Sequence, residues 1–368
     1  MWGPERTSLL RRAFVLAPVL LALAACSTSG GLFKAGGSGK AVTPTSENVG
    51  TGSSAVAILA ADEAHNLSDG TAGSTYLAAR LATTALSGTP IRLLVRRYDG
   101  KSGSLQKAAT ESAQSGAKLV IAPADDATAR ALANALAPRG VSVVSLGQSG
   151  DPANRLFGAF ARRDEVTFSA AEMKRRGYGA VAIVQTTDAA SAAYANDIGE
   201  AAARAGLKVQ FVDGGNAAAA AAQLQSQAAM GFEPRAIVFA TGPAVAAGVM
   251  AAVRAVPDLQ GIAVVGNGGW AVAPPAGLGK GWYPSLSRQG LAGFVEKFTA
   301  AYGQRPTVEA AVAYDLVVLG GALPQVAPDD PFGTTTMTNA QGFAGVTGNF
   351  RFDAGGVARR AFSVVELK

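Results

Sequence analysis

Residue types that could carry out catalysis are scarce in this sequence. His65 is the only histidine, so His-rich metal sites and most Ser-His or Cys-His arrangements lack a part. Residues 147–151, Gly-Gln-Ser-Gly-Asp, nearly match the Gly-x-Ser-x-Gly turn of a nucleophilic serine, but Asp151 takes the place of the second glycine. The adjacent Asp125 and Asp126 stand at a predicted helix start, where capping explains them more simply than a pair of catalytic carboxylates. We therefore predict that the protein is not an enzyme.

Two glycine-rich segments resemble nucleotide-binding loops but lack the surroundings that such loops need. Residues 37–40, Gly-Ser-Gly-Lys, follow no strand, and Lys34 stands where the first glycine of a phosphate loop would be. Residues 266–270, Gly-Asn-Gly-Gly-Trp, follow a predicted strand, yet no helix begins at them. The sequence thus predicts neither a cofactor nor a metal ion.

Small polar and amide side chains recur where the predicted strands end. Parallel strands end at the same edge of a sheet, where exposed N–H groups and helix N-termini can face a polar or anionic ligand. Each of these residues could instead cap a loop, so the set carries more weight than its members. The predicted ligand-binding residues at strand ends are Ser68, Asp69, Asp125, Asp126, Ser145, Gln148, Ser149, Thr241, Asn267 and Trp270.

The elements that must position these residues follow a regular alternation of short β-rich runs with helical stretches. This alternation predicts an α/β fold with two doubly wound parallel-sheet lobes that carry helices on both faces. The stretch 141–160 ends the first series and starts the second, so we interpret it as a hinge between the lobes with a binding rim at 145–149. Strands are expected at 55–61, 91–99, 119–123, 141–145, 180–186, 207–214, 236–240 and 262–266, and helices at 71–86, 103–115, 125–137, 163–176, 189–205, 217–229 and 243–256.

The end of the chain has a different pattern. Two helices are expected at 287–302 and 307–323, followed by a loop rich in proline, aspartate and threonine at 324–338. Two short strands, 346–352 and 361–367, are then expected to form a hairpin around the turn at 353–356. This order indicates that the chain crosses between the lobes more than once.

The composition agrees with a folded protein of two lobes. A chain of 368 residues has room for two domains of ordinary size, and 49% apolar with 16% charged residues is ample for two cores. The net charge of +6 comes from scattered basic residues with few aromatic residues between them. This distribution argues against a nucleic-acid partner.

The N-terminus has the pattern of an export signal. Arg6, Arg11 and Arg12 precede an apolar run at 13–23 that is too short to span a bilayer and is followed by small residues. Cys26 follows Leu-Ala-Ala, an arrangement that resembles the bacterial lipobox, in which the cysteine becomes lipidated; an ordinary signal peptide with an incidental cysteine is the alternative. We therefore predict a signal peptide at 1–25, and a lipidated Cys26 with a flexible tether at 26–54. Cys26 is the only cysteine, so no intramolecular disulfide can form.

Two segments near the end of the chain resemble the Leu/Ile/Val-type periplasmic binding proteins. Residues 290–319 resemble that family's F…Y…P…A…YDA segment, and residues 343–367 resemble its terminal F-x-G-x-T-G…F-D…G hairpin. Tyr98-Asp99 and residues 140–149 fit as well, as does the stretch from residue 163 onward, so the resemblance covers nearly all of 55–368. It implies a type I periplasmic-binding fold, with lobe 1 formed by 55–150 plus 271–342 and lobe 2 by 151–270 plus 343–368.

The predicted ligand site departs from that family at one rim. In the family's amino-acid binders the loop after the third strand presents serine hydroxyls to the ligand's carboxylate. Asp125 and Asp126 stand there in this chain, and they would repel a carboxylate. Gln148 and Ser149 stand where the family has an Ala/Thr pair, and Tyr194 is matched to the family's cleft tyrosine. The resemblance therefore implies the fold more directly than the ligand.

The leading hypothesis is a lipid-anchored solute-binding protein of an ABC-type importer. It would close its lobes on a small polar, amino-acid-like ligand and deliver it to an ABC permease. The alternative is an outer-membrane lipoprotein that activates a penicillin-binding protein, a peptidoglycan synthase, through protein contacts. Ser27, in place of the aspartate of lipoproteins retained at the inner membrane, and the Asp125-Asp126 loop favour this alternative. Both hypotheses place the protein in the cell envelope facing the periplasm, on the outer membrane where the host has two.

Overall fold

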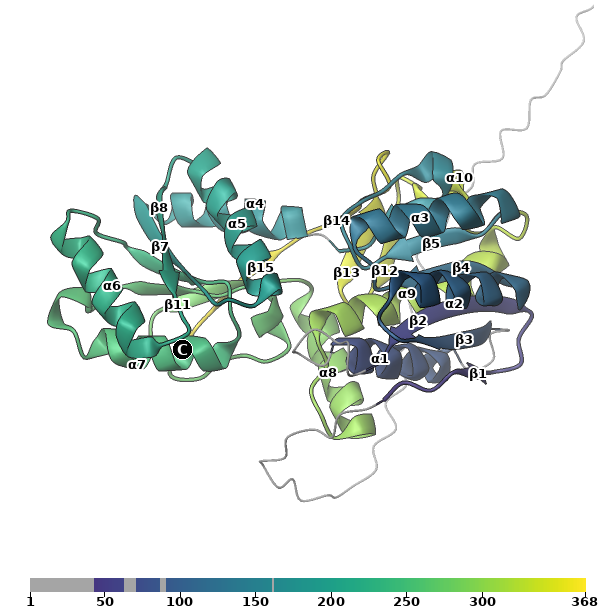
Figure 1. Cartoon of the computed structure of the whole chain (residues 1–368), viewed down its shortest axis with the longest axis horizontal. Helices are drawn as coiled ribbons and strands as arrows, with labels where there is room; N and C mark the ends of the chain where they lie inside the picture. Colours follow the sequence, from purple (N-terminus) through teal and green to yellow (C-terminus); the bar gives the residue numbers. More distant parts are fainter. Residues whose placement is uncertain (1–42, 63–70, 87–90, 161) are drawn as a thin grey trace, which may run out of the picture. The chain divides into compact units, whose positions relative to one another are not determined.

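The computed structural model describes residues 43–62, 71–86, 91–160 and 162–368 of the chain (Figure 1). The predicted signal peptide, Cys26, His65, and the predicted ligand residues Ser68 and Asp69 lie outside these ranges. The described part contains two six-stranded sheets and one three-stranded sheet. Among these residues no helix is both long and apolar enough to span a bilayer.

Sheet 1 is built from the first series of strands. Across the sheet the strands are β1 (Glu47–Val49), β3 (Ile91–Tyr98), β2 (Ser54–Ala61), β4 (Ala117–Ala122), β5 (Ser142–Ser145) and β6 (Leu156–Gly158). All neighbours pair in parallel except β1, which runs antiparallel to β3. The central strand β2 is almost wholly buried, as expected for a parallel strand that is covered on both faces.

Alternate residues of β2 enter two separate cores, one on each face of sheet 1. Val56 and Ile58 pack with α1 (Thr71–Ala85), α8 (Arg288–Tyr302) and α9 (Val308–Val326). Ala57 and Leu59 pack with α2 (Ser102–Gln114) and α3 (Asp126–Leu136) on the opposite face. The period of two along a strand thus explains why an uninterrupted apolar run fits here, since both faces need apolar side chains.

Sheet 2 repeats this arrangement. Its strands, in spatial order, are β15 (Ser363–Glu366), β11 (Gly281–Ser285), β10 (Ala263–Val265), β9 (Ala236–Phe239), β7 (Ala180–Gln185) and β8 (Lys208–Asp213). Val181 and Ile183 of β7 pack with α4 (Arg162–Arg175) and α5 (Ala189–Arg204). Ala182 and Val184 face the other core, with α6 (Ala217–Ala229) and α7 (Pro243–Arg254). The predicted fold class, two largely parallel sheets with helices on both faces, is confirmed.

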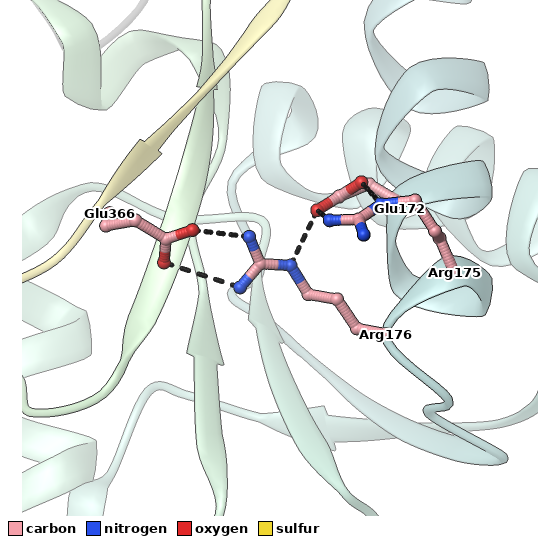
Figure 2. A network of polar contacts seen from close by, with 4 residues as sticks. All are labelled: Glu172, Arg175, Arg176 and Glu366. Carbon is pink, nitrogen blue, oxygen red and sulfur yellow. Dashed lines mark hydrogen bonds and ion pairs between the residues drawn. The ribbon is translucent and has the colours of Figure 1, made fainter.

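The predicted terminal hairpin is wrong. β13 (Gly348–Phe352) pairs with β12 (Phe343–Gly345) and with β14 (Ala358–Arg360), so the turn at 353–356 leads into β14. β15 instead runs antiparallel to β11 at the edge of sheet 2. Val364 and Val365 of β15 pack against the two cores of sheet 2. The ion pair of Glu366 with Arg176, which follows α4, adds a contact between β15 and a helix of the same sheet (Figure 2).

Two short strands set the crossings between the sheets. β6 lies beyond residue 150, in the segment predicted for lobe 2, but it pairs with β5 in sheet 1. β11 lies before residue 342, in a segment predicted for lobe 1, but it pairs with β10 and β15 in sheet 2. β6 has only three residues and β11 contains Pro284, so neither has the sequence pattern of a strand. The segment 324–338, predicted to be a loop, is partly helical. The helix α9 continues to Val326, and a short helix, α10 (Thr334–Met337), lies within the segment. The chain thus passes from sheet 1 to sheet 2 after β6, from sheet 2 to the helices α8 and α9 on sheet 1 after β11, and from the three-stranded sheet back to sheet 2 after β14.

Candidate functional site

The loops after β4 and β5 form one rim of the candidate site, and we call them rim 1. The two strands are neighbours, with Ala122 paired to Ser145, so their loops lie side by side. Asp126 Oδ1 accepts a hydrogen bond from the Ser149 N–H at 3.1 Å, and Arg130 donates to Ser149 Oγ at 3.1 Å. A Cβ on Gly147 would come within 2.8 Å of Asp126 Oδ1, so a side chain here would displace the Asp126 carboxylate from its contact with Ser149.

Asp125 caps α3, as the sequence predicts. Its carboxylate accepts from the Thr128 N–H at 2.9 Å and from the Thr128 hydroxyl at 2.9 Å. The backbone N–H of Thr128 holds the pKa of Asp125 below its ordinary value, because the hydrogen bond favours the charged form. Asp125 and Asp126 are both exposed, so rim 1 presents two carboxylates to solvent.

Ser145 and Gln148 connect rim 1 to the rest of the fold. Ser145 is fully buried at the end of β5, and its hydroxyl accepts from the Gly147 N–H at 3.3 Å. Gln148 Oε1 accepts from the N–H of Arg163 at 3.2 Å, in the first turn of α4. The side chain of Gln148 therefore binds a helix that packs on sheet 2, across the first crossing.

The ends of β9 and β10 form the corresponding edge of sheet 2, which we call rim 2. Asn267 donates to the carbonyl oxygens of Phe239 at 3.2 Å and Thr241 at 2.9 Å, and its own Oδ1 accepts from Gly269. Trp270 is fully buried, and its indole N–H donates to the Thr241 carbonyl at 3.0 Å. These two side chains hold the loop in place. The buried Thr241 Oγ has no hydrogen-bond partner among the described residues.

Tyr194 lies against rim 2 through a buried acid that sequence analysis missed. Its hydroxyl donates to Glu165 Oε1 at 2.8 Å, and the Gly268 N–H donates to the same oxygen at 2.7 Å. Burial raises the pKa of Glu165 and raises that of Tyr194 well above its ordinary value. Glu165 follows two arginines and an aspartate at a helix start, so its burial leaves no trace in the sequence pattern.

A second buried acid stands close to the crossings. Asp315 in α9 accepts from the backbone N–H groups of Val346 at 2.7 Å and Thr347 at 3.0 Å, and also from the Thr347 hydroxyl. Arg360, the last residue of β14, donates to that hydroxyl and lies 4.3 Å from the centre of the Phe350 ring. Burial raises the pKa of Asp315 and lowers that of Arg360 to about 10. Sequence analysis assigned neither residue.

The structure therefore gathers the predicted site residues into two sets. Asp125, Asp126, Ser145, Gln148 and Ser149 share rim 1, whereas Thr241, Asn267, Trp270 and Tyr194 belong to rim 2 or contact it. No group of three or more His, Cys, Asp or Glu side chains in the described ranges is placed to hold a metal ion. Rim 1 exposes charged side chains to solvent, whereas the side chains of Asn267 and Trp270 at rim 2 are hydrogen-bonded within the protein.

Solved structures with the same architecture come from several bacteria. An ABC transporter substrate-binding protein from Desulfitobacterium hafniense, solved in complex with Leu, is 18% identical with a TM-score of 0.61, over 85% of this chain and 98% of its own. A putative branched-chain amino acid ABC transporter protein from Rhodospirillum rubrum is 18% identical with a TM-score of 0.65, over 85% and 97%. A solute-binding protein from R. palustris, in complex with benzoate, is 18% identical with a TM-score of 0.59, over 86% and 94%. At such identities the likeness shows the fold alone, which is that of the two-lobed type I binding proteins.

The sequence itself matches one family model over most of its length. No curated protein matches the chain significantly. The model described as "Periplasmic binding protein" matches residues 36–368. Because this match covers nearly all of the chain, the chain belongs to the periplasmic binding protein family, a family of solute-binding proteins of the cell envelope rather than of enzymes.

Proposed function

We propose that the protein is the lipid-anchored receptor of an ABC-type importer and binds a small polar, amino-acid-like ligand between two lobes. Lobe 1 would be built on sheet 1 and lobe 2 on sheet 2, joined by the three crossings. The observation that carries the proposal is the convergence of rim 1, where neighbouring parallel strands bring Asp126, Ser149 and Arg130 into one contact network beside the exposed Asp125. Ligands bind outside the carboxyl ends of strands in open α/β sheets.

The charges of rim 1 indicate how such a ligand would be oriented. Asp125 and Asp126 favour an ammonium or another hydrogen-bond donor, whereas Arg130 can offset a carboxylate nearby. The Leu-bound and benzoate-bound relatives support a small organic ligand for this chain too.

A thermal-shift screen of amino acids and related metabolites tests the proposal. A ligand that binds only the native state raises the melting temperature, by an amount that grows with its concentration. The Asp126→Asn variant should reduce the shift, whereas Glu296→Gln on the exposed face of α8 is the matched control and should leave it unchanged. A shift that Asp126→Asn leaves intact would place the ligand elsewhere, and no shift across a broad panel would reject the receptor function.

The second candidate is the activator of a penicillin-binding protein, acting from the outer membrane. One observation favours it: the hydroxyl of Tyr194 and the side chains of Asn267 and Trp270 are already committed to contacts within the protein. Affinity capture from envelope extract with the full chain distinguishes the two functions. Recovery of a peptidoglycan synthase supports the activator, and recovery of an importer permease supports the receptor.

The lipid anchor at Cys26 is a separate proposal that both functions share. Mass spectrometry of the N-terminal peptide should find diacylglycerol on Cys26, and Cys26→Ala should release the protein into the soluble envelope fraction. A membrane-bound Cys26→Ala variant would contradict the anchor.

A further inference from the structure

An open hollow of about 430 Å³ lies at the edge of sheet 2 opposite to rim 2. Its walls are the last turns of α6, the loop that precedes β9, and the loop that leads through a short 3₁₀ helix (Pro257–Leu259) into β10. Since β9 and β10 begin here and end at rim 2, the hollow is separated from rim 2 by the length of both strands. Its volume falls within the range of known binding pockets, roughly 300–1,000 Å³.

The hollow is acidic although the chain as a whole carries a net charge of +6. Glu233 and Asp258 line it, both are exposed, and neither forms an ion pair or side-chain hydrogen bond within the described part of the chain. The C-terminus of α6 also ends in the wall at Ala229, where the helix dipole adds partial negative charge. Arg235 is the one cationic residue in the lining, and no ion pair joins it to either carboxylate. A cation entering the hollow would therefore meet two unpaired carboxylates and a helix end.

An exposed methionine lies next to the wall of the hollow that the last turns of α6 form. Met230 comes directly after α6 and is 75% exposed, against 41% for Phe211 and 50% for Val326, the other exposed large apolar residues described. Ala228 and Ala229 supply apolar surface inside the hollow itself, and the buried Leu259 is part of its wall. An unbranched thioether beside an apolar floor is a surface that adapts to a partner side chain.

We propose that this hollow docks an extended segment of a partner protein, one that presents a lysine or arginine next to an apolar side chain. The cation pairs with Glu233 and Asp258, and the apolar neighbour covers Met230. The carboxylates supply charge complementarity, while the adjoining apolar surface favours a peptide over a free inorganic cation. The docking site uses no residue of either rim, so a test of this site can succeed or fail whether or not the ligand proposed above binds.

NMR of the full chain labelled at the methionine methyl groups tests the site directly. Met230 reports on the hollow, and the buried Met173, Met250 and Met337 are internal references. The probe is the peptide acetyl-Gly-Leu-Lys-Leu-Gly-amide, and its counterpart with Glu in place of Lys is the control ligand. We expect the Lys peptide to shift the Met230 signal alone, with a response that weakens in 0.5 M NaCl because salt screens exposed charges.

Variants separate charge recognition from non-specific contact. The Glu233→Gln/Asp258→Asn double variant should weaken the Lys peptide about fivefold to tenfold, the combined effect of two exposed ion pairs. Glu296→Gln removes an exposed carboxylate elsewhere and should change nothing. An unmoved Met230 signal, an equal response to the Glu peptide, or an unchanged affinity in the double variant would each overturn the proposal.

Discussion

Glu172 should contribute a large, pH-dependent share of the stability of lobe 2. The side chain of this residue, near the end of α4, is 8% exposed and accepts hydrogen bonds from Arg175 and from Arg176 Nε, each at 2.6 Å. Arg176 in turn pairs with Glu366 of β15 at 2.5 Å (Figure 2). Its guanidinium also lies 5.3 Å from the centre of the Trp282 ring in β11. The network thus ties α4 to the edge of sheet 2.

The magnitude follows from the pKa of Glu172. Hydrogen bonds from Arg175, followed by those from Arg176, lower this pKa from 4.5 to about 2. At 1.36 kcal/mol per unit, the ionised carboxylate stabilises the fold by up to about 3 kcal/mol relative to its protonated form. Because the folded pKa is the lower one, this contribution is complete above about pH 4.5 and is lost as the pH falls through 2.

Urea unfolding of the parent chain and of Glu172→Gln, at several pH values between 7 and 2, measures this contribution. We expect a loss of up to about 3 kcal/mol at pH 7 and a difference that shrinks steadily below pH 4.5. The matched control is Glu200→Gln, which breaks a highly exposed pair with Arg204 in α5 and should cost less than about 1 kcal/mol. A loss that stays constant from pH 7 to 2, or one no larger than the loss in the control, would refute the reasoning.

Three further substitutions test packing, capping and buried charge by thermal or urea unfolding. Gly147→Ala should destabilise by about 0.5–1.5 kcal/mol, because the new Cβ displaces the Asp126 carboxylate from its hydrogen bond with the Ser149 N–H. Gly103→Ala, with open space around it, should not destabilise, and an equal loss at both sites would contradict this. Asp125→Ala should lower the free energy of unfolding by about 1 kcal/mol, because the helix cap is lost, whereas Asp125→Asn should be about as stable as the parent. An equal loss of stability in both variants would argue against capping. Asp315→Asn should cost about 3–5 kcal/mol, because it leaves the buried Arg360 without a nearby anion, and a neutral result would show that Arg360 needs none.

The local elements could largely be predicted because local chemistry determines them. The apolar run of β2 and the strands β4, β7 and β9 lie where the alternation places them, since a buried parallel strand requires uninterrupted apolar residues. Asp125 lies in a polar position just before a helix, and it caps that helix. The strand β6 escaped prediction, because a run of three residues that follows a turn has too few positions to show a period.

The candidate site could be predicted only in outline. Residues at the ends of neighbouring strands come together by topology alone, which is why Asp126 and Ser149 meet at rim 1. The hydrogen-bond partners of Tyr194, Asn267 and Trp270 could not be predicted, because each partner lies in a segment far away in the sequence. The sequence offers no sign that Glu165 is buried, since its neighbours in the chain are charged.

Sequence patterns alone predicted the α/β class, the two series of strands and the polar groups that stand at strand ends. These depend on periodicity and on turn chemistry, which act over a few residues. The tertiary structure decided that β15 joins sheet 2, that Glu165 and Asp315 are buried, and that an acidic hollow forms beside Met230. Each of these results from contacts between segments far apart along the chain, whose free energy depends on burial in the folded protein and leaves no local pattern in the sequence.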